Sequence, residues 1–154
     1  MMTNAAQRLA ELGIDLPDAP APVANYVPVV RSGSLLYLSG QISIGPGGLI
    51  KGKLGADLAI DQGVAAARAC AINLIAQAKA ALGGDLNRIM RIVKLNGFVN
   101  CTPDFQDQPK VINGASDLFV AVFGEAGRHA RAAVGAPSLP LGAAVEVDAV
   151  FEVR

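Results

Sequence analysis

The residue in this sequence that stands out for chemistry on a small molecule is Arg131. It lies in the run Ala-Arg-Ala-Ala-Val at 130–134, a strand of small residues in which no close neighbour needs a guanidinium. A guanidinium donates two parallel hydrogen bonds to a carboxylate, so Arg131 could clamp a small carboxylate ligand. It could also be a surface residue, or form a structural ion pair with Glu146 or Asp148. On the residues alone the structural interpretation is the simpler one, and both stay open.

Much other chemistry has no residues to support it. The chain has one histidine, His129, so a multi-histidine metal site within one chain and paired-histidine catalysis are not available. Neither a GxSxG nor a P-loop motif occurs. Cys70 and Cys101 lie in apolar surroundings without a CxxC pattern, so we expect two small buried hydrophobes and no metal site.

The composition favours an oligomer that binds a small molecule. Of the 154 residues, 52% are hydrophobic and only 17% charged, which is more apolar surface than one small domain readily hides. The formal net charge is zero, whereas nucleic-acid binding depends on an excess of Lys and Arg. No signal peptide and no apolar run long enough to span a bilayer is visible, so we expect a cytoplasmic protein that binds neither nucleic acid nor membrane.

Local patterns place the elements that must position Arg131. Two β-rich runs, 26–30 and 35–39, flank a short turn and predict a hairpin. Helices are expected at 3–12, from an Asp57 cap through Leu82, and from Pro109 to Phe123, and strands at 88–99 and 145–153. The second of these helices ends at Gly83-Gly84, and Gly45–Gly48 should form a turn. The third helix should bury Ile112, Ala115, Phe119, Val122 and Phe123.

The last strand alternates most cleanly. Its odd-numbered residues from Val145 to Val153 are apolar, whereas Glu146, Asp148 and Glu152 fall on the other face. The element order predicts an α+β fold with helices on one face of a mixed sheet. The other face would then be bare unless a partner covers it, which agrees with the composition.

These residues carry a family resemblance. The C-terminal third holds Arg131, then Leu139-Pro140, then the acidic strand V-E-V-D-A at 145–149. That order resembles the RidA/YjgF family, also labelled the endoribonuclease L-PSP family. Further pieces in the family's order are Tyr26, the run L-S-G-Q-I at 38–42, Asp104-Phe105 and V-I-N at 111–113. The resemblance spans about residues 24 to 153.

The resemblance implies a chorismate-mutase-like fold that assembles as a homotrimer around a central barrel, with ligand clefts between subunits. It also implies an activity without a cofactor: hydrolysis of reactive 2-imino acids to 2-keto acids and ammonia. Two alternatives remain, namely a small-carboxylate-binding trimer without turnover and an L-PSP-type endoribonuclease or translation inhibitor. Retention of both Arg131 and Glu146 favours the enzyme, because binding alone needs only the arginine.

The resemblance also implies roles for single residues. Arg131 would clamp the substrate carboxylate, Glu146 would orient the attacking water, and the carbonyl of Ala133 would help to hold that water. Pocket residues would be Tyr26 and Asn113, with Gly40 shaping the backbone nearby. Residues 1–23 form an N-terminal extension before the family domain at 24–154, and the loop 43–55 is longer than usual, so both indicate a divergent subgroup.

Overall fold

A computed structural model describes residues 4–19 and 25–154, and its centre is a mixed sheet. Five strands lie in the order β1-β2-β7-β5-β6. All neighbours in the sheet are antiparallel except β5 and β6, which are parallel. The strands are β1 (Val29–Ser32), β2 (Leu35–Ile42), β5 (Ile89–Asn100), β6 (Ala130–Ala136) and β7 (Val145–Val153). The α+β prediction is confirmed.

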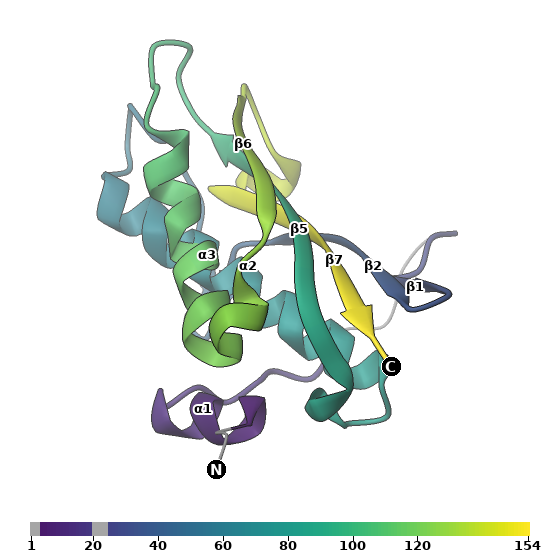
Figure 1. The fold of residues 1–154 in the computed structure, drawn as a ribbon. Helices are drawn as coiled ribbons and strands as arrows, with labels where there is room; N and C mark the ends of the chain where they lie inside the picture. The colour runs from purple at the N-terminus through teal and green to yellow at the C-terminus, as the bar shows by residue number, and fades with distance from the viewer. Residues whose placement is uncertain (1–3, 20–24) are drawn as a thin grey trace.

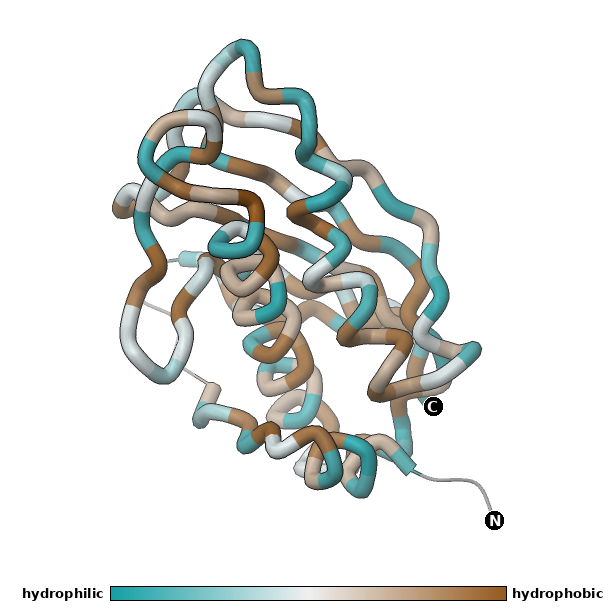
Figure 2. The backbone as a smooth tube through the Cα atoms, turned by 90° about the vertical axis from the view of Figure 1, so that its left-hand side faces the viewer, coloured by the Kyte–Doolittle hydropathy of each residue, from teal (hydrophilic) through white to brown (hydrophobic). Residues whose placement is uncertain are grey.

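Two helices cover one face of this sheet (Figure 1). They are α2 (Ile60–Ala81) and α3 (Gln108–Phe123), which pack against each other as well as against the strands. Along β7 every second residue is buried beneath them, as its alternation predicts, and the side chains between point to the opposite face. The tube in Figure 2 shows the same change between hydrophobic and hydrophilic residues along the strands. The helical layer therefore faces the core, as expected.

The helix boundaries differ from the sequence expectation at one point. Asp57 does not cap α2; its Oδ1 accepts a hydrogen bond of 2.6 Å from the Lys53 backbone and closes the preceding loop. The helix starts at Ile60 instead, where Gln62 Oε1 accepts from the Ala59 backbone N–H at 2.8 Å. A glutamine in the first turn can satisfy a free amide as well as an aspartate before it. The prediction of an Asp57 cap is wrong.

The other boundaries follow the sequence closely. α3 has Pro109 in its first turn and buries the predicted face, except that Phe123 is only partly buried. α2 is followed by Gly83 and Gly84, both with positive φ, as expected for a helix stop. The β1–β2 hairpin forms, but β1 begins at Val29 rather than at Tyr26. The Gly45–Gly48 turn joins a small extra hairpin, β3 (Ile44–Gly45) with β4 (Gly48–Leu49).

The N-terminal segment packs onto the rest of the chain. Helix α1 (Ala5–Glu11) places Ala5 and Leu9 in the hydrophobic core, and Arg8 Nη1 donates to the Val122 carbonyl near the end of α3 at 3.3 Å. A hollow of about 840 Å³ lies between residues 12–17 and α2, with a mainly apolar lining. The described part of the extension thus shares the core of the domain, and the boundary at residue 23 stays a prediction.

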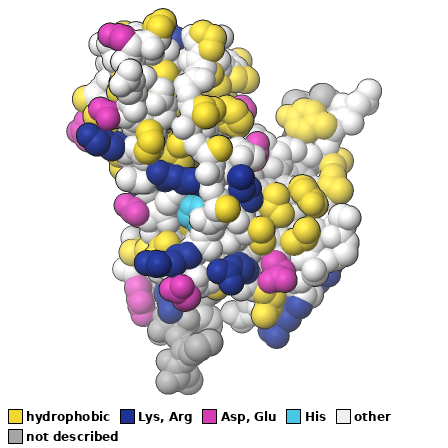
Figure 3. Space-filling view, turned by 45° about the horizontal axis from the view of Figure 1, so that its top comes forward, with side chains coloured by type: hydrophobic (Ala, Val, Ile, Leu, Met, Phe, Trp, Pro, Cys, Tyr) yellow, Lys and Arg dark blue, Asp and Glu magenta, His cyan; other side chains and the backbone are white. Residues whose placement is uncertain are grey.

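Within residues 4–19 and 25–154, no element covers the face of the sheet away from the helices. Its exposed apolar side chains include Val30, Tyr37 and Val134, each about half exposed. Hydrophobic side chains gather on the right-hand side of Figure 3, where β1, β2 and β7 lie in Figure 1. Among the described helices, none combines the length and the hydrophobicity that a membrane span requires.

Candidate active site

Arg131 lies on β6, at the edge of the sheet, and its side chain reaches α3. Nη1 donates to Asn113 Oδ1 at 2.9 Å and to Ser116 Oγ at 3.1 Å, and Nη2 donates to the Pro109 carbonyl at 3.2 Å. Asn113 and Ser116 are three residues apart and so share one face of the helix. Residues 109–116 of α3 therefore hold the guanidinium in one orientation against β6.

This arrangement leaves part of the guanidinium available. An arginine has five N–H donors, of which three bond to α3. Nε–H and one Nη2–H have no acceptor within residues 4–19 and 25–154. Nε and Nη2 are the two nitrogens whose N–H bonds can lie parallel along one side of the plane, which is the geometry that binds both oxygens of a carboxylate.

The pairing of β6 with β5 explains why the side chain of Arg131 faces the helical layer. Arg131 lies beside Leu95 of β5, and Leu95 is fully buried under the helical layer. Ala133 lies beside Gly97 and therefore faces the same way. A side chain at Gly97 would collide with Ile112 of α3, so this glycine lets the helix approach the sheet closely. The structure thus brings Arg131, Asn113 and Ala133 to the same edge.

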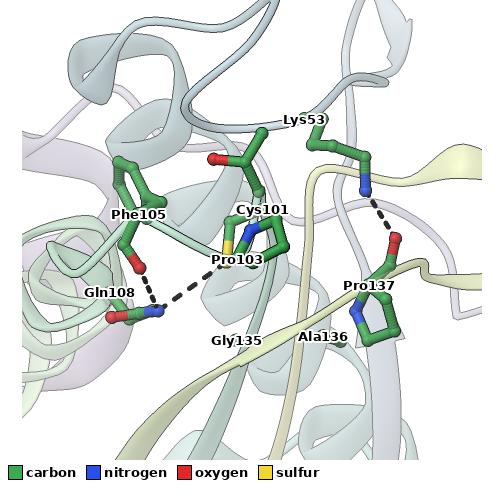
Figure 4. A pocket seen from close by; sticks show the side chains of 9 residues that line it. Lys53, Cys101, Pro103, Phe105, Gln108, Gly135, Ala136 and Pro137 are labelled. Carbon is green, nitrogen blue, oxygen red and sulfur yellow. Dashed lines mark hydrogen bonds between the residues drawn. The ribbon is translucent and has the colours of Figure 1, made fainter.

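A hollow of about 480 Å³ continues from this edge past the end of β6 (Figure 4). Gly135 contributes backbone only, because a Cβ there would lie 2.7 Å from Cys101 Sγ and 3.0 Å from Gln108 Nε2. Gln108 Nε2 donates to the Phe105 carbonyl at 2.9 Å and lies 3.7 Å from Cys101 Sγ. Neither Arg131 nor Glu146 is among the residues that line this hollow.

Lys53 supplies the charge in the hollow. Its Nζ donates to Asn100 Oδ1 at 2.7 Å and to the Pro137 carbonyl. Asn100 is buried and its own amide donates to the Ala143 carbonyl at 3.1 Å. The sequence did not identify Lys53, because its partners are far away in the chain. It did not identify Gln108 either, whose partners Phe105 and Cys101 are near in the chain but meet it only in the folded turn before α3. Cys101 is buried, as predicted, and so is Cys70.

Glu146 occupies a different environment on β7. Its side chain packs over Gly40 of β2, where an added Cβ would come within 3.0 Å of the carboxylate. Partial burial, and secondarily the negative charge of Asp148, raise the pKa of Glu146 above its ordinary value. Asp148 itself accepts a hydrogen bond of 2.8 Å from Asn96 Nδ2. The structure therefore brings Glu146 and Gly40 together, in a setting that makes the carboxylate a stronger base.

The two groups of predicted residues do not meet within one chain. Glu146 alternates with the buried Val145 and Val147 and so faces the uncovered side of the sheet, whereas Arg131 faces the helices. Tyr26 is 58% exposed and precedes β1, at the sheet edge opposite β6. The alternative of an ion pair from Arg131 to Glu146 or Asp148 is wrong. In the described chain, the ion pairs are Lys110–Asp107 and Arg128–Glu125.

The fold and these residues define the class of protein. The model of the YjgF/chorismate-mutase-like family, whose description also carries an endoribonuclease label, matches residues 6–153. The match includes all but the first residue of α1 and every strand of the five-stranded sheet. The chain belongs to this family.

Individual relatives place it more closely. Protein TCP17 of Trypanosoma cruzi is 56% identical over 97% of this chain and 94% of its own length. A crystal structure of a protein of unknown function from Agrobacterium tumefaciens is 51% identical, with a TM-score of 0.89 over 97% of this chain and 91% of that one. The 2-iminobutanoate/2-iminopropanoate deaminase of Dermatophagoides farinae is 27% identical over 92% of this chain and 95% of its own.

Proposed function

We propose that this chain is an enamine/imine deaminase, which hydrolyses reactive 2-imino acids to 2-keto acids and ammonia. The observation that carries the proposal is the state of Arg131: three hydrogen bonds to α3 fix its guanidinium, and Nε–H and one Nη2–H remain for a ligand carboxylate. The name of the Dermatophagoides farinae relative supports the same chemistry.

The reaction needs positioning more than strong chemical activation. Arg131 fixes the substrate carboxylate beside the imine carbon. Glu146, as a carboxylate, accepts a proton from a water molecule while the water oxygen bonds to that carbon. That proton passes to the imine nitrogen and gives a carbinolamine. Glu146 then takes the proton of the new hydroxyl and returns it to the same nitrogen, so that the carbon–nitrogen bond breaks and ammonia leaves as the carbonyl forms. The raised pKa of Glu146 suits this role, because a general base works best with a pKa near the working pH. No cofactor takes part in this sequence.

The same proposal requires more than one subunit. Arg131 and Glu146 face opposite sides of the sheet, so one ligand can meet both only where two chains adjoin. We therefore include a homotrimer with intersubunit clefts in the proposal, with Tyr26 and Gly40 on the side of Glu146, and Asn113 and Ala133 on the side of Arg131. Packing of the uncovered apolar sheet face against neighbouring subunits would remove it from water.

A carboxylate-binding trimer without turnover is the second candidate. It shares the Arg131 clamp and differs in needing no general base. The placement of Glu146 over Gly40, with a raised pKa, favours the enzyme over this candidate.

The endoribonuclease label in the family description gains less support from these residues. Ribonuclease catalysis commonly uses a histidine as acid or base. Both ring nitrogens of the chain's one histidine, His129, are engaged in hydrogen bonds to protein atoms.

The decisive experiment measures keto-acid and ammonia release from 2-imino acids that an amino-acid oxidase generates in situ. We expect the wild type to accelerate hydrolysis over the spontaneous rate, and Arg131→Ala to lower kcat/KM by about 100-fold. Arg128→Ala is the matched control, since Arg128 is 71% exposed and pairs only with Glu125 in the described chain. If the wild type gives no acceleration with small or bulky imines but binds 2-keto acids through Arg131, the non-catalytic candidate replaces the enzyme.

A further inference from the structure

Arg131 is the end of a chain of hydrogen bonds that no part of the proposed reaction uses. Ser116 Oγ accepts from Arg131 Nη1 at 3.1 Å and lies 2.9 Å from His129 Nε2. His129 Nδ1 lies 2.7 Å from the Gly127 carbonyl oxygen. The order is therefore Arg131, Ser116, His129 and the Gly127 carbonyl, running from β6 across α3 to the turn that precedes β6.

The direction of each bond follows from its two ends. A guanidinium can only donate, so Ser116 Oγ is the acceptor from Arg131. A carbonyl can only accept, so His129 Nδ1 carries a hydrogen and donates to Gly127. The Ser116 hydroxyl hydrogen then has His129 Nε2 as its acceptor, provided that the imidazole is neutral. All three bonds are satisfied at once in a single tautomer, with the hydrogen on Nδ1.

Packing fixes the His129 end of this series of hydrogen bonds. The His129 ring lies edge-on to Phe119, with centroids 6.1 Å apart and an interplanar angle of 74°, and Phe119 is fully buried. Gly127 is buried against the Phe119 carbonyl so closely that a Cβ would collide with it. Neither the imidazole nor its carbonyl partner can move far, so the Ser116 hydroxyl receives a fixed orientation.

We propose that Ser116 and His129 are positioning residues for Arg131, which hold its guanidinium so that Nε–H and one Nη2–H face the ligand carboxylate. This inference rests on the proposed role of Arg131 as a carboxylate clamp. Neither Ser116 nor His129 touches the substrate. They restrict the guanidinium to few orientations before the ligand binds. Less conformational entropy is then lost on binding, so they act on affinity rather than on the chemical step.

The kinetic test separates a positioning role from a structural one. Ser116→Ala should raise KM for 2-imino acids by about tenfold with kcat nearly unchanged, because the lost interaction supports ground state and transition state equally. Ser116→Thr keeps the hydroxyl and should restore KM. His129→Phe keeps the ring contact with Phe119 but removes the hydrogen bonds to Ser116 and Gly127. The double variant Ser116→Ala with His129→Phe should have a KM no higher than that of either single variant. Additive losses, or a fall in kcat at constant KM, would overturn the proposal.

A second measurement does not depend on turnover. His129 is the one histidine of the chain, so its imidazole ¹⁵N signals need no assignment to a residue. We expect the tautomer with the hydrogen on Nδ1, and pyruvate, a stable 2-keto acid, should shift the Nε2 signal in the wild type but not in Ser116→Ala. An Nε2–H tautomer, or the absence of a pyruvate shift in the wild type, would contradict the proposed positioning role of Ser116 and His129. If pyruvate shifts Nε2 while no imine is hydrolysed, the deaminase proposal fails and the positioning role stands.

Discussion

Arg131 and Glu146 lie on opposite faces of the same sheet. Across the strands, Arg131 aligns with Leu95 of β5 and through it with Ala149 of β7, both buried beneath the helices. Glu146 aligns with Phe98 and lies on the other side. In a β-strand, neighbouring side chains alternate between the faces, so no rotamer change brings the two groups together through the sheet. A site that uses both residues must draw them from two chains.

Mixed assemblies should therefore recover activity from two inactive variants. Arg131→Ala and Glu146→Gln are each expected to lose nearly all deaminase activity as homotrimers. When the two are unfolded together in equal amounts and refolded, about a quarter of the clefts in a random trimer should combine an intact arginine with an intact glutamate. The measurement is imine hydrolysis by the mixture, with each variant refolded alone as the control. Activity no higher than the mean of the two variants would show that Arg131 and Glu146 do not act together in one cleft.

The pH dependence of the reaction should follow Glu146. Its raised pKa has burial as the larger cause and the charge of Asp148 as the smaller one. Glu146 must be ionised to accept a proton, so kcat/KM should fall as the pH drops through that pKa. Asp148→Asn removes the repelling charge, which lowers the pKa of Glu146 and moves this acidic limb to lower pH. Glu152→Gln, farther along the same face of β7, should leave the limb in place; a limb unmoved in Asp148→Asn would separate it from Glu146.

A methyl group at position 40 should disturb the base without unfolding the protein. In Gly40→Ala the new Cβ would lie 3.0 Å from the Glu146 carboxylate, and Gly40 has no positive φ that an alanine would strain. The end of the glutamate side chain can move aside, so we expect kcat to fall by about tenfold with little change in melting temperature. Gly47→Ala is the matched control, because nothing lies within 4 Å of a Cβ there. Full activity in Gly40→Ala would show that the position of Glu146 is not critical.

Stability should be sensitive at the crossing of α2 and α3. An alanine inside a helix normally gains up to about 1 kcal/mol over glycine. At Gly114 the added Cβ would collide with the Val64 backbone carbonyl of α2, which cannot rotate away. Gly114→Ala should therefore lower the free energy of unfolding by about 2 kcal/mol, measured by urea denaturation. Asp117→Ala, exposed on the same helix, is the control, and a Gly114→Ala protein as stable as the wild type would contradict the close crossing.

The sequence was informative about the fold because the signals are local. Alternation along residues 145–153 and the helical spacing of apolar residues along α2 depend only on neighbours in the chain. Both elements formed, although α2 begins at Ile60 and not after an Asp57 cap. The error at Asp57 is of a different kind. Both Asp57 and Gln62 can satisfy a free amide near the helix start, and the loop geometry that decides between them is not a local property of the sequence.

For the same reason, only part of the candidate site could be predicted from the sequence. The family pattern pointed to Arg131 and Asn113, and the structure joins them by a hydrogen bond of 2.9 Å. Their proposed roles remain predictions. Ser116 was missed although its spacing from Asn113 puts both on one helix face, a signal that could have found it. Lys53 could not have been found, since its partners Asn100 and Pro137 are far away in the chain.

Arg8 links the N-terminal helix to α3, the helix that holds Arg131. Its guanidinium bonds to the Val122 carbonyl near the end of α3, and Asn113 and Ser116 lie earlier on the same helix. Natural variation at position 8 would thus alter how firmly the whole helix is seated, and through it the setting of Arg131. If Arg131 holds the substrate carboxylate as proposed, homologues that differ only in this first helix should differ in their affinity for that carboxylate while every residue around it stays the same.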